Sequence, residues 1–179
     1  GMFALLAFGN KLLDTLLDWA EEEHTNISLP SLRVDGFSEE LANRLNVLRR
    51  AGLTFAPEAG TQRLRDVINK NLTEEEILTS CANAFAGGWN NVKLYFMIGL
   101  PTETPEDIQG IADLSMKDLD TYFAIPKEER AKNINITTST SSFIPKPFTA
   151  FQWAKQNSRE EIIEKQDALK AAITSRRIR

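Results

Sequence analysis

Three short segments carry side chains that suit ligand binding, and each follows an apolar stretch that predicts a strand. The first is residues 56–63, Ala-Pro-Glu-Ala-Gly-Thr-Gln-Arg. Its Glu58 can accept hydrogen bonds from the hydroxyls of a sugar diol, and Arg63 can bind a carboxylate or fix Glu58 in place. A structural ion pair between Glu58 and Arg63 explains the same spacing, so the sequence alone leaves both interpretations open.

The second segment, residues 97–107, places Gly99 directly after an apolar run. A glycine there allows a flat ligand to approach the backbone closely, and the amides that begin the following helix can bind an anion. The alternative interpretation is a Gly-Pro turn followed by a well-capped helix. A phosphate-binding P-loop is excluded, because no Gly-Lys-Ser or Gly-Lys-Thr follows.

The third segment, residues 141–153, is rich in aromatic residues and prolines. Such a rigid apolar lip suits a platform for an adenine ring or a surface for a protein partner. It suits equally a hydrophobic plug that closes one end of the fold, and the spacing does not decide among the three.

Cysteine and histidine are scarce, with only Cys81 and His24 in the chain. This excludes a disulfide framework, a zinc or iron–sulfur site built by this chain alone, and a Ser/His/Asp or Cys/His catalytic arrangement. We therefore predict no metal ligands. Cys81 lies on the apolar stripe of a predicted helix, where a thiol packs in the core. A lone cysteine also favours a reducing compartment and hence the cytoplasm.

The composition is that of a globular protein. The chain has 179 residues, of which 42% are hydrophobic and 26% are charged. We expect one domain over residues 2–179, with Gly1 as the remnant of a removed tag. No apolar run reaches the roughly 20 residues that cross a bilayer, so no membrane segment is expected. The net charge of −4 argues against a general nucleic-acid binder.

Hydrophobic periodicity and capping signals predict a helix followed by four strand–helix units. The strands are expected over residues 26–34, 53–56 and 92–98 and from residue 134, and the helices over residues 10–23, 38–52, 61–68, 73–87, from 104, and 158–173. This alternation predicts an α/β fold, an incomplete TIM-like β/α barrel with about four parallel units. Ligand-binding residues then lie at the C-terminal strand ends. The strand over residues 27–34 would leave an unpaired sheet edge, which predicts self-association.

Two of these segments together resemble motifs of the radical S-adenosylmethionine (SAM) superfamily. Residues 58–64 with 68–70 resemble the Glu/Gln-Ser-Gly segment after the fourth barrel strand, and residues 99–107 resemble the Gly-Phe/Leu-Pro-Gly-Glu-Thr element after the fifth. Residues 31–35 and 142–153 are similar to signatures of the cobalamin-binding-type branch, also described as Fe–S oxidoreductases. The resemblance covers the chain from Asn10 to its end.

The resemblance implies the C-terminal part of a radical SAM barrel, with SAM and a 4Fe–4S cluster as cofactors of the intact protein and cobalamin as a further candidate. In that family the reduced cluster cleaves SAM and the resulting radical abstracts hydrogen from a substrate. The roles implied here are the ribose and carboxylate side of SAM for Glu58 and Arg63, backed by Arg33, and the adenine border for Ile98, Gly99 and Phe143. No catalytic residue is identified.

The superfamily's Cys-x3-Cys-x2-Cys motif does not occur in this sequence. We therefore expect a fragment that is inactive alone, with the remainder of a parent chain as its partner and source of the cluster ligands. The alternative is a non-enzymatic barrel domain that binds a partner through residues 143–153. A third interpretation is a module for an RNA substrate, against which the net negative charge argues.

Overall fold

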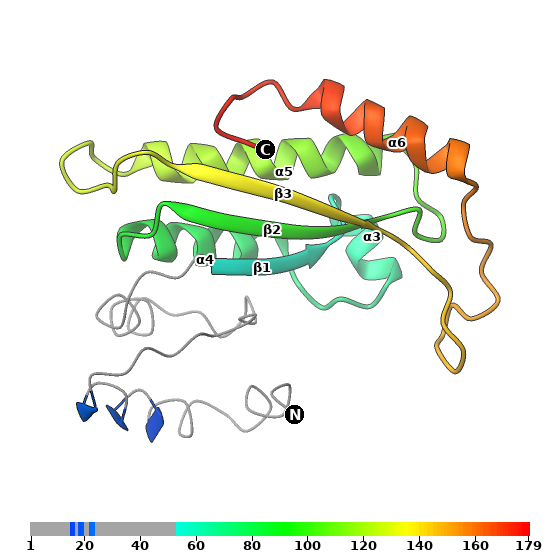
Figure 1. Cartoon of the computed structure of the whole chain (residues 1–179), viewed down its shortest axis with the longest axis horizontal. Helices are drawn as coiled ribbons and strands as arrows, with labels where there is room; N and C mark the ends of the chain where they lie inside the picture. The colour runs from blue at the N-terminus through cyan, green and yellow to red at the C-terminus, as the bar shows by residue number, and fades with distance from the viewer. Residues whose placement is uncertain (1–14, 17, 20–21, 24–52) are drawn as a thin grey trace.

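The computed structural model describes residues 15–16, 18–19, 22–23 and 53–179 (Figure 1). The predicted strand over 26–34, the helix over 38–52 and the site residue Arg33 lie outside the described residues. The elements from residue 53 onward follow one another as strand and helix: β1 (Leu53–Glu58), α3 (Gln62–Val67), α4 (Glu74–Ala86), β2 (Asn91–Ile98), α5 (Pro105–Ala124), β3 (Asn135–Ser142) and α6 (Arg159–Ala172).

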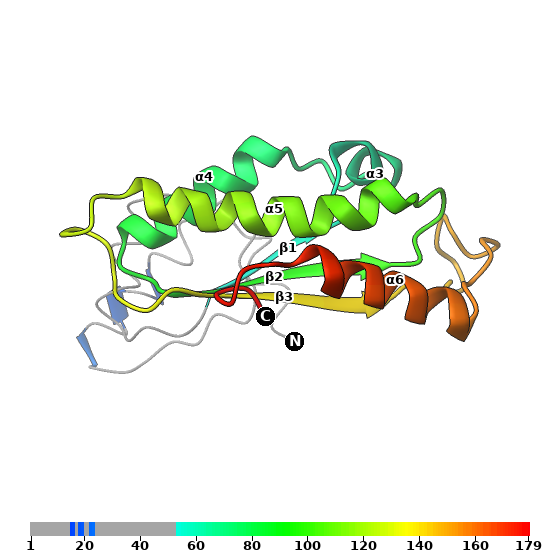
Figure 2. The same cartoon turned by 90° about the horizontal axis from the view of Figure 1, so that it is seen from above.

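The three strands form one parallel sheet in the order β1-β2-β3. Each strand is joined to the next by a helical crossover, with α3 and α4 between β1 and β2 and with α5 between β2 and β3. Figure 2 shows α4 and α5 along one face of the sheet, with α6 beside α5. The predicted alternation and the parallel pairing are therefore confirmed over these three strand–helix units.

Side chains adjacent to the helix starts explain where the helices begin. The Thr61 hydroxyl accepts a hydrogen bond from the Leu64 amide at the start of α3. Thr73 with Glu76 and Ser158 with Glu161 form complete capping boxes at α4 and α6. These contacts satisfy amides that would otherwise lack partners, as the sequence pattern predicts.

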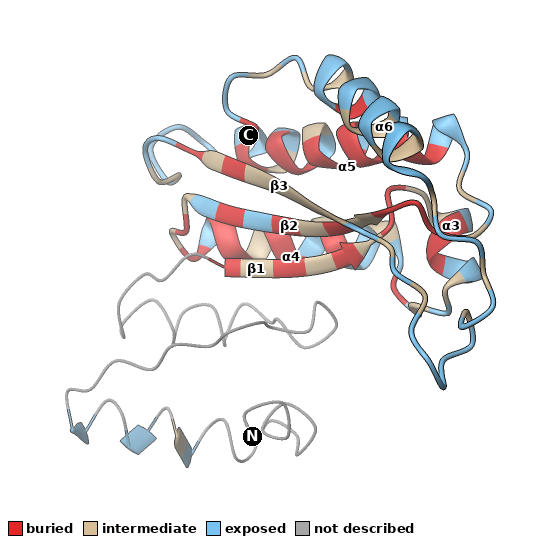
Figure 3. Cartoon of the chain, turned by 45° about the vertical axis from the view of Figure 1, so that its right-hand side comes forward, coloured by how far each residue is buried: buried red, intermediate tan, exposed pale blue. Residues whose placement is uncertain are grey.

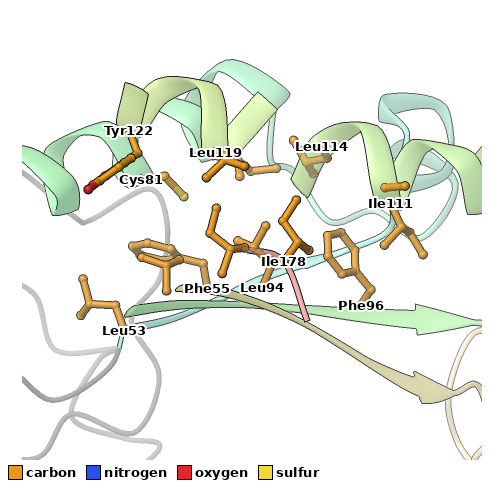
Figure 4. Packing of buried hydrophobic residues seen from close by; sticks show 14 of the residues in the cluster. Leu53, Phe55, Cys81, Leu94, Phe96, Ile111, Leu114, Leu119, Tyr122 and Ile178 are labelled. Carbon is orange, nitrogen blue, oxygen red and sulfur yellow. The ribbon is translucent and has the colours of Figure 1, made fainter. Parts of the chain in front are cut away.

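The main hydrophobic core lies between the sheet and the helices. Figure 4 shows side chains of the strands, such as Phe55 and Leu94, meeting Ile111 and Leu119 of α5 and Cys81 of α4. The C-terminal segment returns to the far edge of the sheet, where Ile178 forms a parallel bridge with Ile136 of β3.

Strand β2 is buried on only one face, although its nearly continuous apolar sequence predicts burial on both. Val92, Leu94, Phe96 and Ile98 are buried. The residues between them, Lys93, Tyr95 and Met97, are exposed or half-buried. The reason is that the described helices cover a single face of the sheet (Figure 2). Within the described residues, no helix is long and apolar enough to cross a membrane.

Candidate functional site

The C-terminal ends of the three strands lie together at one end of the sheet, its carboxyl edge, because all three run in the same direction (Figure 1). Glu58 of β1 is in register with Phe96, and Ile98 of β2 is in register with Ser142 of β3. The Phe143 amide donates a hydrogen bond to the Ile98 carbonyl at 2.8 Å. Glu58, Gly99 and Phe143 therefore occupy the same edge, as the sequence predicts.

A small apolar cluster lies at this edge, separate from the main core. Its buried members are Ala59, Leu64 and Leu100, and the half-buried Met97 and Phe143 pack against them. The Phe143 ring also meets Phe151 edge-on, with 6.2 Å between the ring centroids. Half-buried apolar side chains beside a strand end suit the face of a flat ring.

Glu58 has an unusual backbone conformation at the point where β1 ends. Its φ is 68°, in the left-handed region, and the register of β1 against β2 shifts between Phe55 and Glu58. A non-glycine residue in this region carries strain of the kind that clusters at functional sites. Its half-buried carboxylate pairs with Lys70 Nζ at 3.3 Å, so the alternative ion pair with Arg63 is not the one that forms.

Arg63 is bound to the start of α5. Its guanidinium forms an ion pair with Asp107 and donates to the Thr102 carbonyl at 2.9 Å and to the Thr102 hydroxyl at 3.3 Å. Asp107 also accepts hydrogen bonds from the Thr61 hydroxyl and from the Thr104 amide and hydroxyl. These contacts give Arg63 a clear structural role, because they tie the loop after β1 to the loop after β2.

Asp107 is only 2% exposed, and its carboxylate accepts all of these hydrogen bonds from Arg63, Thr61 and Thr104. Burial acts to raise the pKa of its carboxyl, but hydrogen bonds from Thr61, Thr104 and Arg63 outweigh burial and hold the pKa below its ordinary value. The same carboxylate completes the cap of α5 through the Thr104 amide. The start of α5 is thus capped by its own side chains, which supports the well-capped-helix interpretation of this segment.

Sequence reasoning missed Arg65, which lies in the short helix α3 and is fully buried. Its guanidinium donates to the carbonyls of Leu72 at 3.1 Å, Ala59 at 3.0 Å and Gly60 at 3.3 Å. Burial lowers the pKa of Arg65, and the nearby Glu74 and Asp66 partly oppose this effect. Nothing in the local pattern marks Arg65 as buried, because arginine in a short helix normally faces solvent.

The loop after β1 lies directly against the backbone of α5. A Cβ atom on Gly60 would lie 2.3 Å from the Ile111 amide nitrogen, and one on Gly110 would lie 2.7 Å from Thr61 Cγ2. Only glycine permits this approach at either position. This close contact fixes the distance between the loop that follows Glu58 and the backbone of α5.

Position 99 requires glycine because of its backbone conformation and because side chains in and just before α6 pack against it. Its φ is +84°, and a Cβ atom would lie 3.0 Å from Asn157 Oδ1 and 3.1 Å from Ile162 Cδ1. A ligand is therefore not needed to explain this glycine. The Ile98 side chain points into the main core, which leaves only its backbone at the edge, and its neighbour Met97 packs in the edge cluster instead.

The aromatic segment after β3 is largely on the surface (Figure 3). Phe148 is 98% exposed and Trp153 is 90% exposed, whereas Phe143 and Phe151 pack against each other. The segment thus combines a half-buried ring at the strand edge with two exposed rings farther along the loop.

Cys81 is a core thiol, as predicted. It is buried between α4 and α5, and burial raises the pKa of the thiol further above its ordinary value. Among the residues that the structure describes, no group of three or more His, Cys, Asp or Glu side chains could hold a metal ion.

Comparison with known proteins gives consistent matches. A sequence profile described as the Radical SAM superfamily matches residues 5–115. An uncharacterized protein of Methanocaldococcus jannaschii is 37% identical over 142 residues, which make up 79% of this chain and 29% of that protein. The coproporphyrinogen III oxidase HemN of Escherichia coli, described as a radical SAM enzyme, matches with a TM-score of 0.60 at 18% identity.

The structural match covers 93% of this chain and 37% of the HemN chain. At this level of identity it establishes a likeness of fold. The chain spans well under half the length of either protein.

Proposed function

The chain belongs to the radical SAM superfamily, and on that premise we propose that it forms the C-terminal part of a radical SAM barrel and binds the ribose and adenine end of SAM. The observation that supports this site most directly is the meeting of Glu58, Gly99 and Phe143 at one edge of a parallel sheet. In β/α barrels this edge is where ligands bind.

The residues at the edge suit different parts of a nucleoside. The Glu58 carboxylate can accept hydrogen bonds from the two ribose hydroxyls, while Lys70 holds it in place from the side. Phe143 and Met97 offer apolar contact for the adenine ring, and Gly99 with the Ile98 backbone borders it. Arg63, engaged by Asp107 and Thr102, would support the loop rather than reach the methionine carboxylate.

The residues of this chain do not fit a 4Fe–4S cluster. The sequence has a single cysteine, and Cys81 is buried in the helix-facing core away from the strand ends. We therefore propose that the cluster ligands come from the remainder of a longer protein and that this chain alone is inactive. Reductive cleavage of SAM and hydrogen abstraction from a substrate would belong to that protein, as would any cobalamin of the proposed branch.

A titration with SAM, followed by amide chemical shifts of the whole chain, tests the proposed site. Without metal chelation of the methionine end, we expect weak binding, with Kd around 1 mM, or about −4 kcal/mol. Shifts should concentrate at Glu58, Gly99 and Phe143. Glu58→Ala should weaken binding about tenfold or more, since a charge-assisted hydrogen bond is worth roughly 1.5–3 kcal/mol.

Glu75→Ala is the matched control, because Glu75 is an exposed glutamate in the first turn of α4. It should leave SAM binding unchanged. Shifts that cluster on a different face of the sheet, or an equal effect of both substitutions, would refute the assignment of the site.

A second candidate function is partner binding without catalysis, which the exposure of Phe148 and Trp153 favours. It predicts no SAM-dependent shifts at the strand edge. It also predicts that the double substitution Phe148→Ser/Trp153→Ser weakens association with the remainder of the longer protein supplied as a separate chain. Association unaffected by this double substitution would eliminate the partner-binding candidate.

A further inference from the structure

A buried carboxylate connects the turn at Gly99 to the last helix. Glu103 has a side chain that is only 1% exposed, and its Oε1 atom accepts two hydrogen bonds. One comes from the Gly99 amide at 2.9 Å and the other from Lys165 Nζ at 2.6 Å. Lys165 also donates to Asn157 Oδ1 at 2.7 Å, and Asn157 packs directly against Gly99.

These contacts join parts of the chain that are far apart in sequence. Lys165 lies in α6, 62 residues after Glu103, which is in the loop between β2 and α5. Gly99 adopts a left-handed conformation, which glycine reaches without steric cost. The contacts that hold its orientation are the hydrogen bond to Glu103 and the packing of Asn157 and Ile162.

We propose that Lys165 is a positioning residue for the nucleoside site, acting through Glu103 to fix the backbone at Gly99. This inference rests on the proposed function for its ligand, but the contacts that carry it do not involve the ligand. The Gly99 turn directly follows Ile98, whose carbonyl accepts a hydrogen bond from the Phe143 amide. The same link therefore sets the position of β2 relative to the Phe143 ring.

The charge on Lys165 is what keeps Glu103 buried. The second carboxylate oxygen, Oε2, is buried without a hydrogen-bond partner among the described residues. Among the described residues, Lys165 is the one cationic side chain within hydrogen-bonding distance of the Glu103 carboxylate. Removing it would leave a buried charge uncompensated, which is strongly unfavourable. Glu103 would then turn toward solvent and release the Gly99 amide.

The test compares Lys165→Met, Lys165→Arg and Lys170→Met in the full chain. Lys170 is the matched control, because it lies in the same helix with an exposed side chain and pairs with the exposed Asp167. Three quantities are measured: the exchange rate and chemical shift of the Gly99 amide, the Kd for SAM, and the unfolding midpoint. The amide readout requires no ligand, so it reports on positioning even where SAM does not bind.

We expect Lys165→Met to speed exchange of the Gly99 amide at least about tenfold and to raise the Kd for SAM by a similar factor, as loss of a charge-assisted hydrogen bond implies. Lys165→Arg retains the charge and should restore most of both properties. Lys170→Met should change neither. An unchanged Gly99 amide in folded Lys165→Met would overturn the inference.

A second variant covers the case in which Lys165→Met does not fold. The pair Glu103→Met/Lys165→Met removes both charges together with the acceptor of the Gly99 amide, and it should fold with the Gly99 amide less protected than in the wild type. Wild-type protection in this double variant would show that the Glu103–Lys165 link is not needed to hold the Gly99 amide and would overturn the inference. If the wild type fails to bind SAM while the Gly99 amide still responds to Lys165→Met, the proposed function fails and the positioning role stands.

Discussion

Replacing Asp118 by asparagine should remove a large part of the pH dependence of stability between about pH 4 and pH 7. Asp118 lies on the side of α5 that meets α4, is 0% exposed, and has the buried Cys81 thiol of α4 beside its carboxylate. Burial raises the pKa of this carboxyl from 3.8 to about 7, and interaction with the Cys81 thiol opposes the rise only in part. The folded protein therefore binds a proton that the unfolded chain has lost.

The sign and size of the effect follow from this difference in proton binding. Because its pKa is raised in the folded state, Asp118 makes its largest contribution to the free energy of unfolding below pH 4. This contribution falls as the pH rises toward 7 and then stays level. The shift from 3.8 to about 7 corresponds to a loss of at most about 4 kcal/mol, at roughly 1.4 kcal/mol for each pH unit. Asp118→Asn cannot ionise, so this fall should be absent from its unfolding free energy.

Urea unfolding at intervals from pH 4 to pH 8 measures the difference between the two proteins. Other groups titrate in both proteins, so the quantity of interest is the wild-type free energy minus that of Asp118→Asn. We expect this difference to fall steadily with pH, with the variant more stable at pH 8 if burial of the amide costs less than the charge. Asp120→Asn is the control, because Asp120 is exposed on the same helix. A difference that stays constant with pH would refute the reasoning.

Two further substitutions test the loop after β1. Gly60→Ala places a Cβ 2.3 Å from the Ile111 nitrogen, and we expect a loss of about 3 kcal/mol in urea unfolding, typical of overpacking against backbone; a loss well below 1 kcal/mol would contradict this close contact. Arg65→Met removes the Arg65 donor from the carbonyls of Ala59 and Gly60, while the Leu72 carbonyl keeps its hydrogen bond from Gln62 Nε2, and should cost about 3 kcal/mol, since each unsatisfied buried group costs roughly 1–3 kcal/mol. The exposed Arg159 provides the control Arg159→Met, and an equal loss in both arginine variants would argue against the role of Arg65.

The local features of this protein could be predicted from the sequence. The Thr73–Glu76 and Ser158–Glu161 capping boxes, the start of α5 at Pro105 and the buried position of Cys81 all follow from residues within one or two turns of each other. Capping and helical periodicity depend on near neighbours, so they are legible without a fold. The strand–helix alternation likewise predicts the parallel order of β1, β2 and β3.

The partners of the charged residues at the strand edge were decided by tertiary packing. Arg63 pairs with Asp107, 44 residues away, and Lys165 with Glu103, 62 residues away. These pairs exist because Gly60 lets the loop after β1 lie on the backbone of α5, and because α6 packs against Gly99. No spacing rule in one sequence connects residues so far apart.

The faces of β2 were decided in the same way. Ile98 and Met97 are neighbours of similar polarity, and an apolar run does not state which of them faces the helices. In the folded protein the helices cover the face that carries Ile98, so Met97 packs instead with Phe143 in the small apolar cluster at the C-terminal ends of the strands. The sequence determined the elements and their caps, through interactions between near neighbours, whereas the packing of the helix layer decided which side chains meet at the site.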